Sequence, residues 1–169
     1  TDFTRERILN ADATTVSVGY YEGGVYNNYW VLIFSYPENS HTEGYRQEVL
    51  NLVNAQRAKY GLTALEMGDD ALTAAAQTRA EEISVVNSHV RPDGSKCFTV
   101  LKDYGVTDTP TGENAAWGSV SPEEVVNAWM NSEGHRANIL NPEARKMSVG
   151  YYYNSNSTWG HQWIQIFTK

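Results

Sequence analysis

The feature that most constrains this sequence is an internal repeat that relates its two ends. When the chain is shifted by 131 positions, residues 5–21 align with residues 136–152 without a gap. The string SVGYY at 17–21 recurs at 148–152. Thr4 stands where the later copy has His135, so the first copy lacks that imidazole. The repeat predicts two related folding units, of which the first is incomplete.

Both copies have the pattern of a β-hairpin. In the first copy, strands over 15–21 and 29–36 flank a turn rich in Gly and Asn. The string WVLIF at 30–34 corresponds to WIQIF at 163–167 in the second copy. We interpret residues 1–40 as the terminal hairpin of an upstream repeat plus a linker, and residues 41–169 as one complete domain. The alternative is a coincidental similarity between two tyrosine-rich hairpins.

An apolar strand at 30–34 would favour aggregation if it were exposed. We therefore expect the first hairpin to pack on the domain that follows it.

Bulk composition excludes several classes of protein. A length of 169 residues suffices for one domain with a real core. The net charge of -7 argues against nucleic acid or anionic lipid as a main partner. No apolar run approaches the ~18 residues of a transmembrane segment. The chain begins without Met or a signal peptide, which suggests a processed or trimmed product.

The patterns within 41–169 predict alternating helices and strands. We expect four helices: one from Tyr45 to Tyr60, one that begins after a cap at Asp69 or Asp70, one over 96–104, and one that begins at Ser121 and is ended by Gly134. We expect extended segments at 112–118, 147–153 and 162–168. This places His135 just past a helix terminus. The order predicts an α+β fold, a three-layer α-β-α sandwich with a small, mainly antiparallel sheet.

His89, Glu113 and His135 are the residues whose types could carry chemistry, because each lies beside turn-forming or helix-ending residues. Two imidazoles and a carboxylate can hold a divalent cation with a position left for water. Their separations match no local metal-binding motif, and the same residues can equally be hydrogen-bonded structural groups. Zinc, calcium and magnesium all remain open as the cation.

Glu113, Arg136 and Cys97 each have two readings, whereas Asn114 has one. Glu113 is either a ligand or general base, or a carboxylate that satisfies backbone donors in a bend. Asn114 is better suited to bridging two backbone segments. Arg136 is an anion hook or a clamp on an acidic side chain or a helix C-terminus. Cys97 is a nucleophile or, given its apolar neighbours, a plain core thiol; being the sole cysteine, it excludes an intramolecular disulfide.

Five motifs in order resemble the CAP superfamily. The motifs are HVRPDG at 89–94, GEN at 112–114, the helix end AWMNSEGHRANIL at 128–140, VG at 149–150 and WIQIF at 163–167. This superfamily takes in cysteine-rich secretory proteins, antigen 5, plant pathogenesis-related proteins and bacterial SCP-like proteins. The likeness covers residues 43–169 and is greatest to the bacterial branch, which usually lacks the disulfides of eukaryotic members.

The resemblance implies an α-β-α sandwich, an extracellular or cell-surface location, and a central cleft where eukaryotic members gather two His and two Glu, in several cases around a divalent cation. His89, Glu113 and His135 match three of these four positions. The place of the fourth falls nearest Ser132, with Glu133 one residue beyond.

The resemblance leaves the activity open. Family members have been associated with sterol or lipid binding, with proteolysis and with host interaction. The leading interpretation is a secreted binding or interaction module rather than an enzyme, directed at an extracellular ligand or surface component, because the sequence has no complete nucleophile set. The alternatives are a hydrolase that depends on a metal or on the Glu and His residues, and a structural cell-surface domain.

Overall fold

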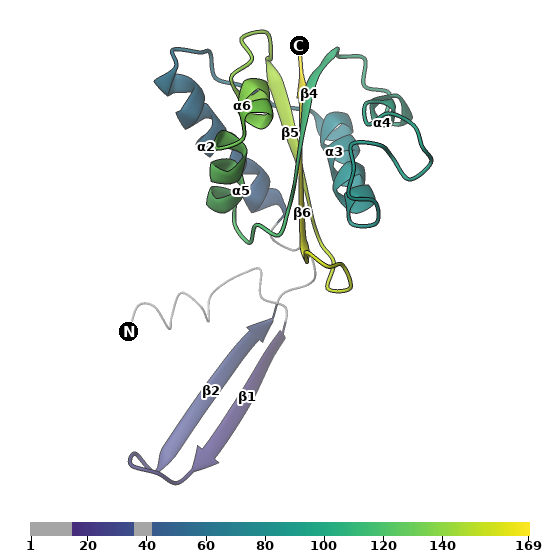
Figure 1. Cartoon of the computed structure of the whole chain (residues 1–169). Coiled ribbons are helices and arrows are strands. Elements are labelled where there is room, and N and C mark those ends of the chain that lie inside the picture. Colours follow the sequence, from purple (N-terminus) through teal and green to yellow (C-terminus); the bar gives the residue numbers. More distant parts are fainter. Residues whose placement is uncertain (1–14, 36–41) are drawn as a thin grey trace. The chain divides into compact units, whose positions relative to one another are not determined.

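The computed structural model describes residues 15–35 and 42–169, which belong to two units divided between residues 41 and 42. The described part of the first unit is a β-hairpin of β1 (Thr15–Glu22) and β2 (Asn28–Ser35), paired antiparallel (Figure 1). Its turn contains Gly24 and Asn27 at positive φ, the conformation for which Gly and Asn are suited. The predicted hairpin is thereby confirmed. The first strand ends one residue later and the second begins one residue earlier than predicted, and the predicted last residue, 36, lies outside the described residues.

The second unit is a mixed domain of helices and strands. Its elements are α2 (Thr42–Lys59), β3 (Glu66–Met67), α3 (Asp70–Ile83), α4 (Thr99–Asp103), β4 (Pro110–Trp117), α5 (Pro122–Met130), α6 (Glu133–Ile139), β5 (Lys146–Tyr153) and β6 (His161–Thr168). Sequence patterns anticipated all of them except α6 and the two-residue strand β3.

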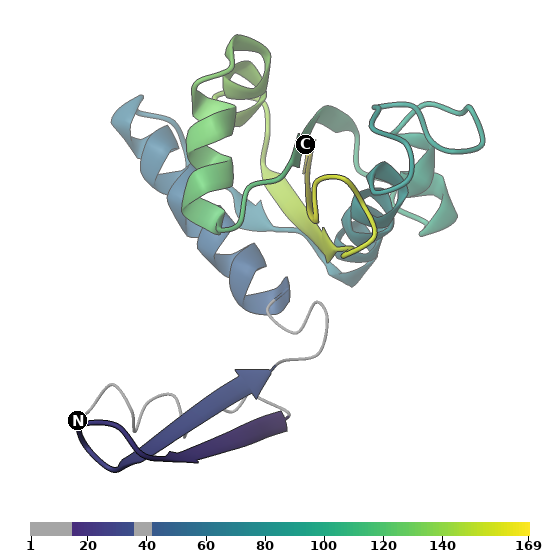
Figure 2. The same cartoon turned by 60° about the horizontal axis from the view of Figure 1, so that its bottom comes forward.

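One four-stranded sheet forms the middle layer, in the order β3-β5-β6-β4. The β5–β6 and β4–β6 pairs are antiparallel, whereas the short β3 runs parallel to β5. Helices α2, α5 and α6 lie on one face and α3 and α4 on the other (Figures 1 and 2). The three-layer α-β-α sandwich with a mainly antiparallel sheet is confirmed.

Local sequence signals set where two of the helices begin. The Asp69 side chain accepts a hydrogen bond from the Leu72 amide at 2.9 Å, which satisfies a donor in the first turn of α3. Ser121 caps α5 in the same way, and Pro122 follows at the first helical position, where its missing N–H costs no hydrogen bond. Both helix starts agree with the sequence expectation.

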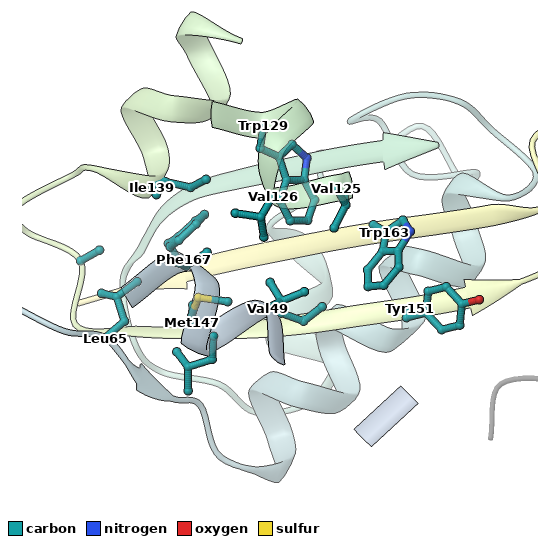
Figure 3. Packing of buried hydrophobic residues seen from close by; sticks show 14 residues of the cluster. Val49, Leu65, Val125, Val126, Trp129, Ile139, Met147, Tyr151, Trp163 and Phe167 are labelled. Carbon is teal, nitrogen blue, oxygen red and sulfur yellow. The ribbon is translucent and has the colours of Figure 1, made fainter. Parts of the chain in front are cut away.

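Each face of the sheet has its own hydrophobic core. The larger core lies under α2 and α5 and contains the buried indoles of Trp129 and Trp163 (Figure 3). The second lies under α3 and uses small residues, among them Ala76. There Gly150 of β5 allows close approach, because a Cβ at this position would fall on the backbone carbonyl of Ala76.

The predicted end of α5 was wrong. Helix α5 ends at Met130, and Gly134 lies inside α6 instead of ending a helix. The physical reason is that Ser132 adopts an extended conformation and restarts the chain as a second short helix. His135 is therefore a residue of α6 and not a residue just past a helix terminus, which fixes its backbone more firmly than a loop would.

Candidate functional site

His89 is anchored to Glu113 across two elements far apart in the sequence. His89 lies in the connection after α3, and Glu113 lies on β4. The Nδ1 atom of His89 is 2.8 Å from Oε1 of Glu113, and because an ionised carboxylate only accepts, the imidazole donates. The His89 side chain is 55% exposed while that of Glu113 is 2% exposed. The pair thus joins a surface imidazole to a buried carboxylate.

Arg79 of α3 binds the same carboxylate from the buried side. Its Nε lies 3.0 Å from Oε2 of Glu113 and its Nη2 lies 3.3 Å from Oε1, a two-point contact between guanidinium and carboxylate. The Arg79 side chain is fully buried. The sequence reading missed this residue, although a charged residue within the alanine stripe of α3 was a signal that a buried partner exists.

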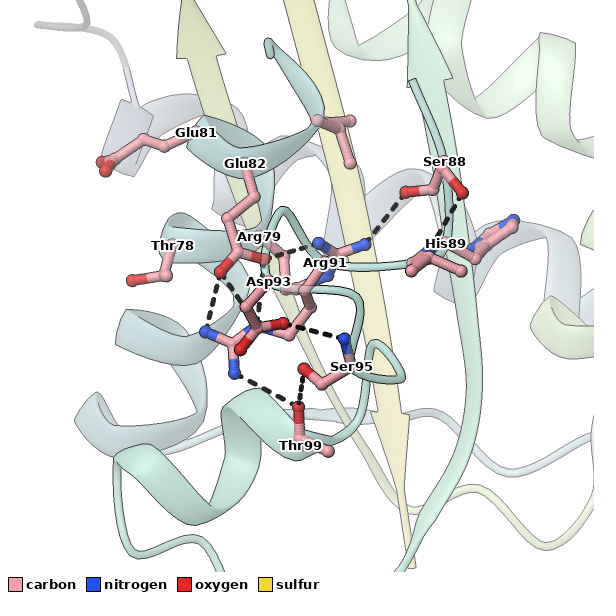
Figure 4. A network of polar contacts seen from close by, with 12 residues as sticks. Thr78, Arg79, Glu81, Glu82, Ser88, His89, Arg91, Asp93, Ser95 and Thr99 are labelled. Carbon is pink, nitrogen blue, oxygen red and sulfur yellow. Dashed lines mark hydrogen bonds and ion pairs between the residues drawn. The ribbon is translucent and has the colours of Figure 1, made fainter. Parts of the chain in front are cut away.

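The ion pair continues into a wider network on the α3 side of the sheet (Figure 4). Nη1 of Arg79 lies 2.6 Å from Glu82, and Glu82 also accepts from Arg91 at 2.7 Å. Arg91 reaches Asp103 at 2.7 Å with its other terminal nitrogen. Every charge in this network is met by an opposite one, so Arg91 ties the 91–94 turn to α3 and α4 and fixes the loop that carries His89.

His135 is placed by a separate set of amide contacts. The Asn114 side-chain nitrogen donates to the His135 carbonyl at 3.1 Å and to Oε1 of Gln165 at 3.0 Å. Asn138 of α6 donates to Oδ1 of Asn114 at 2.8 Å. The Asn114 amide thus contacts one backbone carbonyl and two side chains, and of these partners Asn138 and Gln165 were not recognised from the sequence.

The two histidines have opposite pKa shifts. The hydrogen bond from His89 to Glu113 raises the pKa of His89 above its ordinary value of about 6.5. Burial and the nearby charge of His89 lower the pKa of His135. The charge of His89 is the smaller of the two causes that lower the pKa of His135. We call His89, Glu113 and His135 the histidine site.

The remaining predicted residues lie around α6. Ser132 occupies the position before the helix without a capping hydrogen bond from its side chain, and Glu133 is exposed in the first turn. Arg136 donates to the Met130 carbonyl at 3.2 Å, so it clamps the C-terminal end of α5. This contact is consistent with the clamp interpretation of Arg136.

Cys97 is a free, half-buried thiol that precedes α4. Burial and the nearby Glu113 carboxylate raise its pKa to about 11. At neutral pH the sulfur is therefore protonated, and a thiol is a far weaker nucleophile than a thiolate. This supports the reading of Cys97 as a core thiol.

The predicted cation site was tested against the donor arrangement. Across residues 15–35 and 42–169, no three His, Cys, Asp or Glu side chains form a group that could hold a metal ion. Both oxygens of Glu113 accept from Arg79, and one of them also accepts from His89. A three-ligand site that includes Glu113 does not fit this arrangement, which leaves the two imidazoles as nitrogen donors.

A second feature is an apolar pocket beside α4. Its volume is about 310 Å³, near the lower end of the range for small-molecule sites. Phe98, Leu101 and Val106 supply apolar walls. The lining also includes Lys96, Lys102 and Asp108, and Asp108 is paired with Lys146 at 2.8 Å. The sequence reading did not anticipate this pocket.

Comparison with known proteins identifies the family. The CAP family, described as the cysteine-rich secretory protein family, matches residues 50–167. The chain belongs to this family. It is 41% identical over 127 residues to YkwD of Bacillus subtilis (strain 168), an uncharacterized protein; the match takes in 74% of this chain and 49% of YkwD. The chain therefore spans about half the length of this relative.

Solved structures show the same fold. An extracellular protein containing an SCP domain from Bacillus anthracis is 25% identical with a TM-score of 0.68, over 83% of this chain and 47% of that chain. An outer surface protein from Borrelia burgdorferi is 23% identical with a TM-score of 0.64, over 73% of this chain and 90% of that chain. Among the described helices, none is both long enough and apolar enough to cross a membrane.

Proposed function

We propose that this CAP domain is an extracellular binding module that engages a polar group of a surface component through His89 and His135. The proposed location follows the solved neighbours, which are described as an extracellular protein and an outer surface protein. The proposed mode of recognition follows from how the chain holds His89.

The observation that supports the proposal is an exposed imidazole fixed to a fully buried ion pair. Removing the charges of Arg79 and Glu113 from water costs several kcal/mol per ion before their attraction is counted. An apolar pair would fill the same space without that cost. The arrangement is thus better suited to orienting His89 toward solvent than to stabilising the domain.

The electrostatics favour a ligand group that is acidic. The Glu113 charge is compensated by Arg79, so an incoming carboxylate or phosphate meets imidazole nitrogens rather than an uncompensated negative charge. Imidazole N–H groups form the strongest hydrogen bonds with ionised acceptors. An acidic sugar or a phosphorylated surface polymer has this chemistry.

The test is an NMR titration of the histidine ring nitrogens with glucuronate and with inorganic phosphate, using glucose as the neutral control. We expect the acidic probes to shift the His89 resonances and glucose to leave them unchanged. The variant His89→Gln should lose the response, whereas His161→Gln, which alters a histidine hydrogen-bonded to Tyr151, should keep it. Equal responses to glucose and glucuronate would refute the proposal.

The divalent cation is a further proposal at the same residues. With Glu113 engaged by Arg79, the ring nitrogens of His89 and His135 would be the ligands, and imidazole ligation suits zinc better than calcium or magnesium. A bound zinc ion would supply Lewis acidity to a ligand oxygen.

The pocket beside α4 favours a second function, the binding of a small apolar molecule with an acidic end. Phe98 and Leu101 would cover an acyl chain, and Lys96 and Lys102 would pair with a carboxylate. Octanoate, compared with octanol, tests this by calorimetry. Filling the pocket with Val106→Phe should abolish octanoate binding, and Val120→Phe, at an exposed loop position, should not.

A further inference from the structure

The hairpin β1–β2 reproduces the pairing of β5–β6 throughout. Tyr20 pairs with Trp30 as Tyr151 pairs with Trp163. The same holds for all eight cross-strand pairs when the first strand is shifted by 131 positions and the second by 133. Only the connecting loop differs, because it is two residues longer in the second copy. The sequence repeat is therefore also a structural repeat.

The two hairpins differ in what covers them. Trp163 is fully buried under α2 and α5, whereas its counterpart Trp30 is 65% exposed. On the other face, Ile166 is fully buried against the α3 core and its counterpart Ile33 is 62% exposed. Considered by itself, the first hairpin thus has two apolar faces of the kind that a CAP domain covers with helices, and apolar strands left exposed are an aggregation hazard.

Gly19 gives independent information about which element packs on this face of the first hairpin. In the second copy, Gly150 is required because a Cβ would fall on the α3 backbone. At Gly19, a Cβ would meet Val31 at 3.9 Å, an ordinary contact, and no closer atom of the described residues. The hairpin alone therefore leaves room for a side chain. A helix packed as closely as α3 would explain a glycine here.

We propose that residues 15–35 are the C-terminal strand pair of a second CAP-type domain, whose helices are encoded upstream of Thr1 in the same polypeptide. A helix like α3, with small residues on its inner side, covers the Gly19 face. Helices like α2 and α5 cover the face of Tyr20 and Trp30. Residues 42–169 do not need the hairpin for this purpose, because β5 and β6 already occupy the equivalent positions of their sheet.

The first copy lacks the counterparts of His135 and of Gln165. Leu32 stands in register where the second copy has Gln165, the residue that accepts from Asn114. Thr4 stands in sequence where the second copy has His135. The first copy therefore differs from residues 42–169 at one residue of the histidine site and at one residue that supports it.

Hydrogen exchange tests the proposal. Amide exchange over residues 15–35 is compared between the chain of residues 1–169 and the same chain extended by the ~100 residues encoded upstream, a typical domain length. We expect exchange at least ~10-fold slower in the extended protein, because packed strands open less often. Equal exchange in the two proteins would overturn the proposal. So would protection within 1–169 that increases with protein concentration, which would identify a second copy as the cover.

A glycine variant separates close helix packing from general protection. In the extended protein, Gly19→Val should restore fast exchange over 15–35, as Gly150→Val should over 146–168. In the chain of residues 1–169, Gly19→Val should leave exchange unchanged, since Val31 is the neighbour it meets. Unchanged protection in the extended Gly19→Val protein would contradict a helix like α3 on that face.

Discussion

His89 and Glu113 lie 2.8 Å apart while one side chain is mostly in solvent and the other is almost wholly buried. The buried carboxylate of Glu113 thereby fixes the orientation of the His89 imidazole at the surface. Because Arg79 neutralises most of that charge, the carboxylate positions the imidazole without acting as a free acid in the site. The histidine site is therefore better described as an imidazole oriented by a neutralised carboxylate than as a site in which Glu113 is a free ligand.

The Glu113→Gln variant should lower the pKa of His89. The hydrogen bond to the carboxylate is the largest cause of the raised value, and a neutral amide gives weaker support to the protonated ring. An NMR pH titration of the ring resonances measures this. An unchanged His89 pKa in the variant would show that the pair is not formed in solution.

The two histidines should contribute to stability in opposite senses as pH changes. The pKa of His89 is raised on folding, so its contribution is complete below about pH 6.5 and is lost as pH rises through the folded-state value. The pKa of His135 is lowered on folding, so its contribution is present above about pH 6.5 and is lost as pH falls toward the folded-state value. Urea unfolding of His135→Gln between about pH 5 and about pH 8 should show stability falling with pH more steeply than in the wild type. A slope equal to the wild-type slope would contradict the assignment.

Replacing Arg79 with Met should destabilise the domain by roughly 3–5 kcal/mol, because it leaves the buried Glu113 charge without its partner. Urea denaturation measures the loss. The matched control is Lys169→Met, which removes an exposed ion pair with Glu143 and should leave the denaturation midpoint unchanged. Similar midpoints for both variants would mean that the Arg79 pair is not buried.

Gly150→Ala should destabilise the domain by about 1–3 kcal/mol, because the added methyl group forces α3 away from β5. Gly134→Ala is the control, since a Cβ there meets nothing within 4 Å and the residue lies in α6. The control should gain roughly 0.5–1 kcal/mol from reduced backbone entropy. Thermal unfolding of both variants measures these changes in stability. An alanine at position 150 that leaves the stability unchanged would contradict the close packing of α3.

Calorimetric titration of metal-free protein with zinc, calcium and magnesium tests the cation proposal. We expect zinc to release heat that is reduced in His89→Ala and in His135→Ala but kept in His161→Ala. Calcium and magnesium should give no such heat, because they require several oxygen ligands and the carboxylate of Glu113 is engaged. Equal zinc heats for the wild type and both variants would remove the site.

Much of the fold could be predicted because its signals are local. Asp69 and Ser121 mark helix starts through capping, and the hairpin strands have turn residues between them. Helix α6 was missed because only two residues separate it from the end of α5 and it contains Gly134, a residue type that usually marks a helix end. Gly134 was wrongly taken as the end of a helix, since glycine is also tolerated inside a short helix that neighbouring contacts fix.

The candidate site was only partly predictable because its support is non-local. His89, Glu113 and His135 could be selected by residue type and by family resemblance, but their partners come from other elements. Arg79 reaches Glu113 across 34 positions, and Gln165 reaches Asn114 across 51. No local pattern relates residues at such separations. The charged residue within an alanine stripe was the one available hint.

We propose above all that His89, oriented by Glu113 and Arg79, is the group through which this CAP domain engages an acidic ligand. The most direct measurement is the glucuronate titration followed at the histidine ring nitrogens in the wild type, in Arg79→Met and in His89→Gln, at a temperature where all three are folded. The account predicts a saturable shift at His89 in the wild type, a weaker one in Arg79→Met, and no comparable shift at the remaining rings in His89→Gln. A shift of the same size at His161, or glucose acting as well as glucuronate, would contradict it.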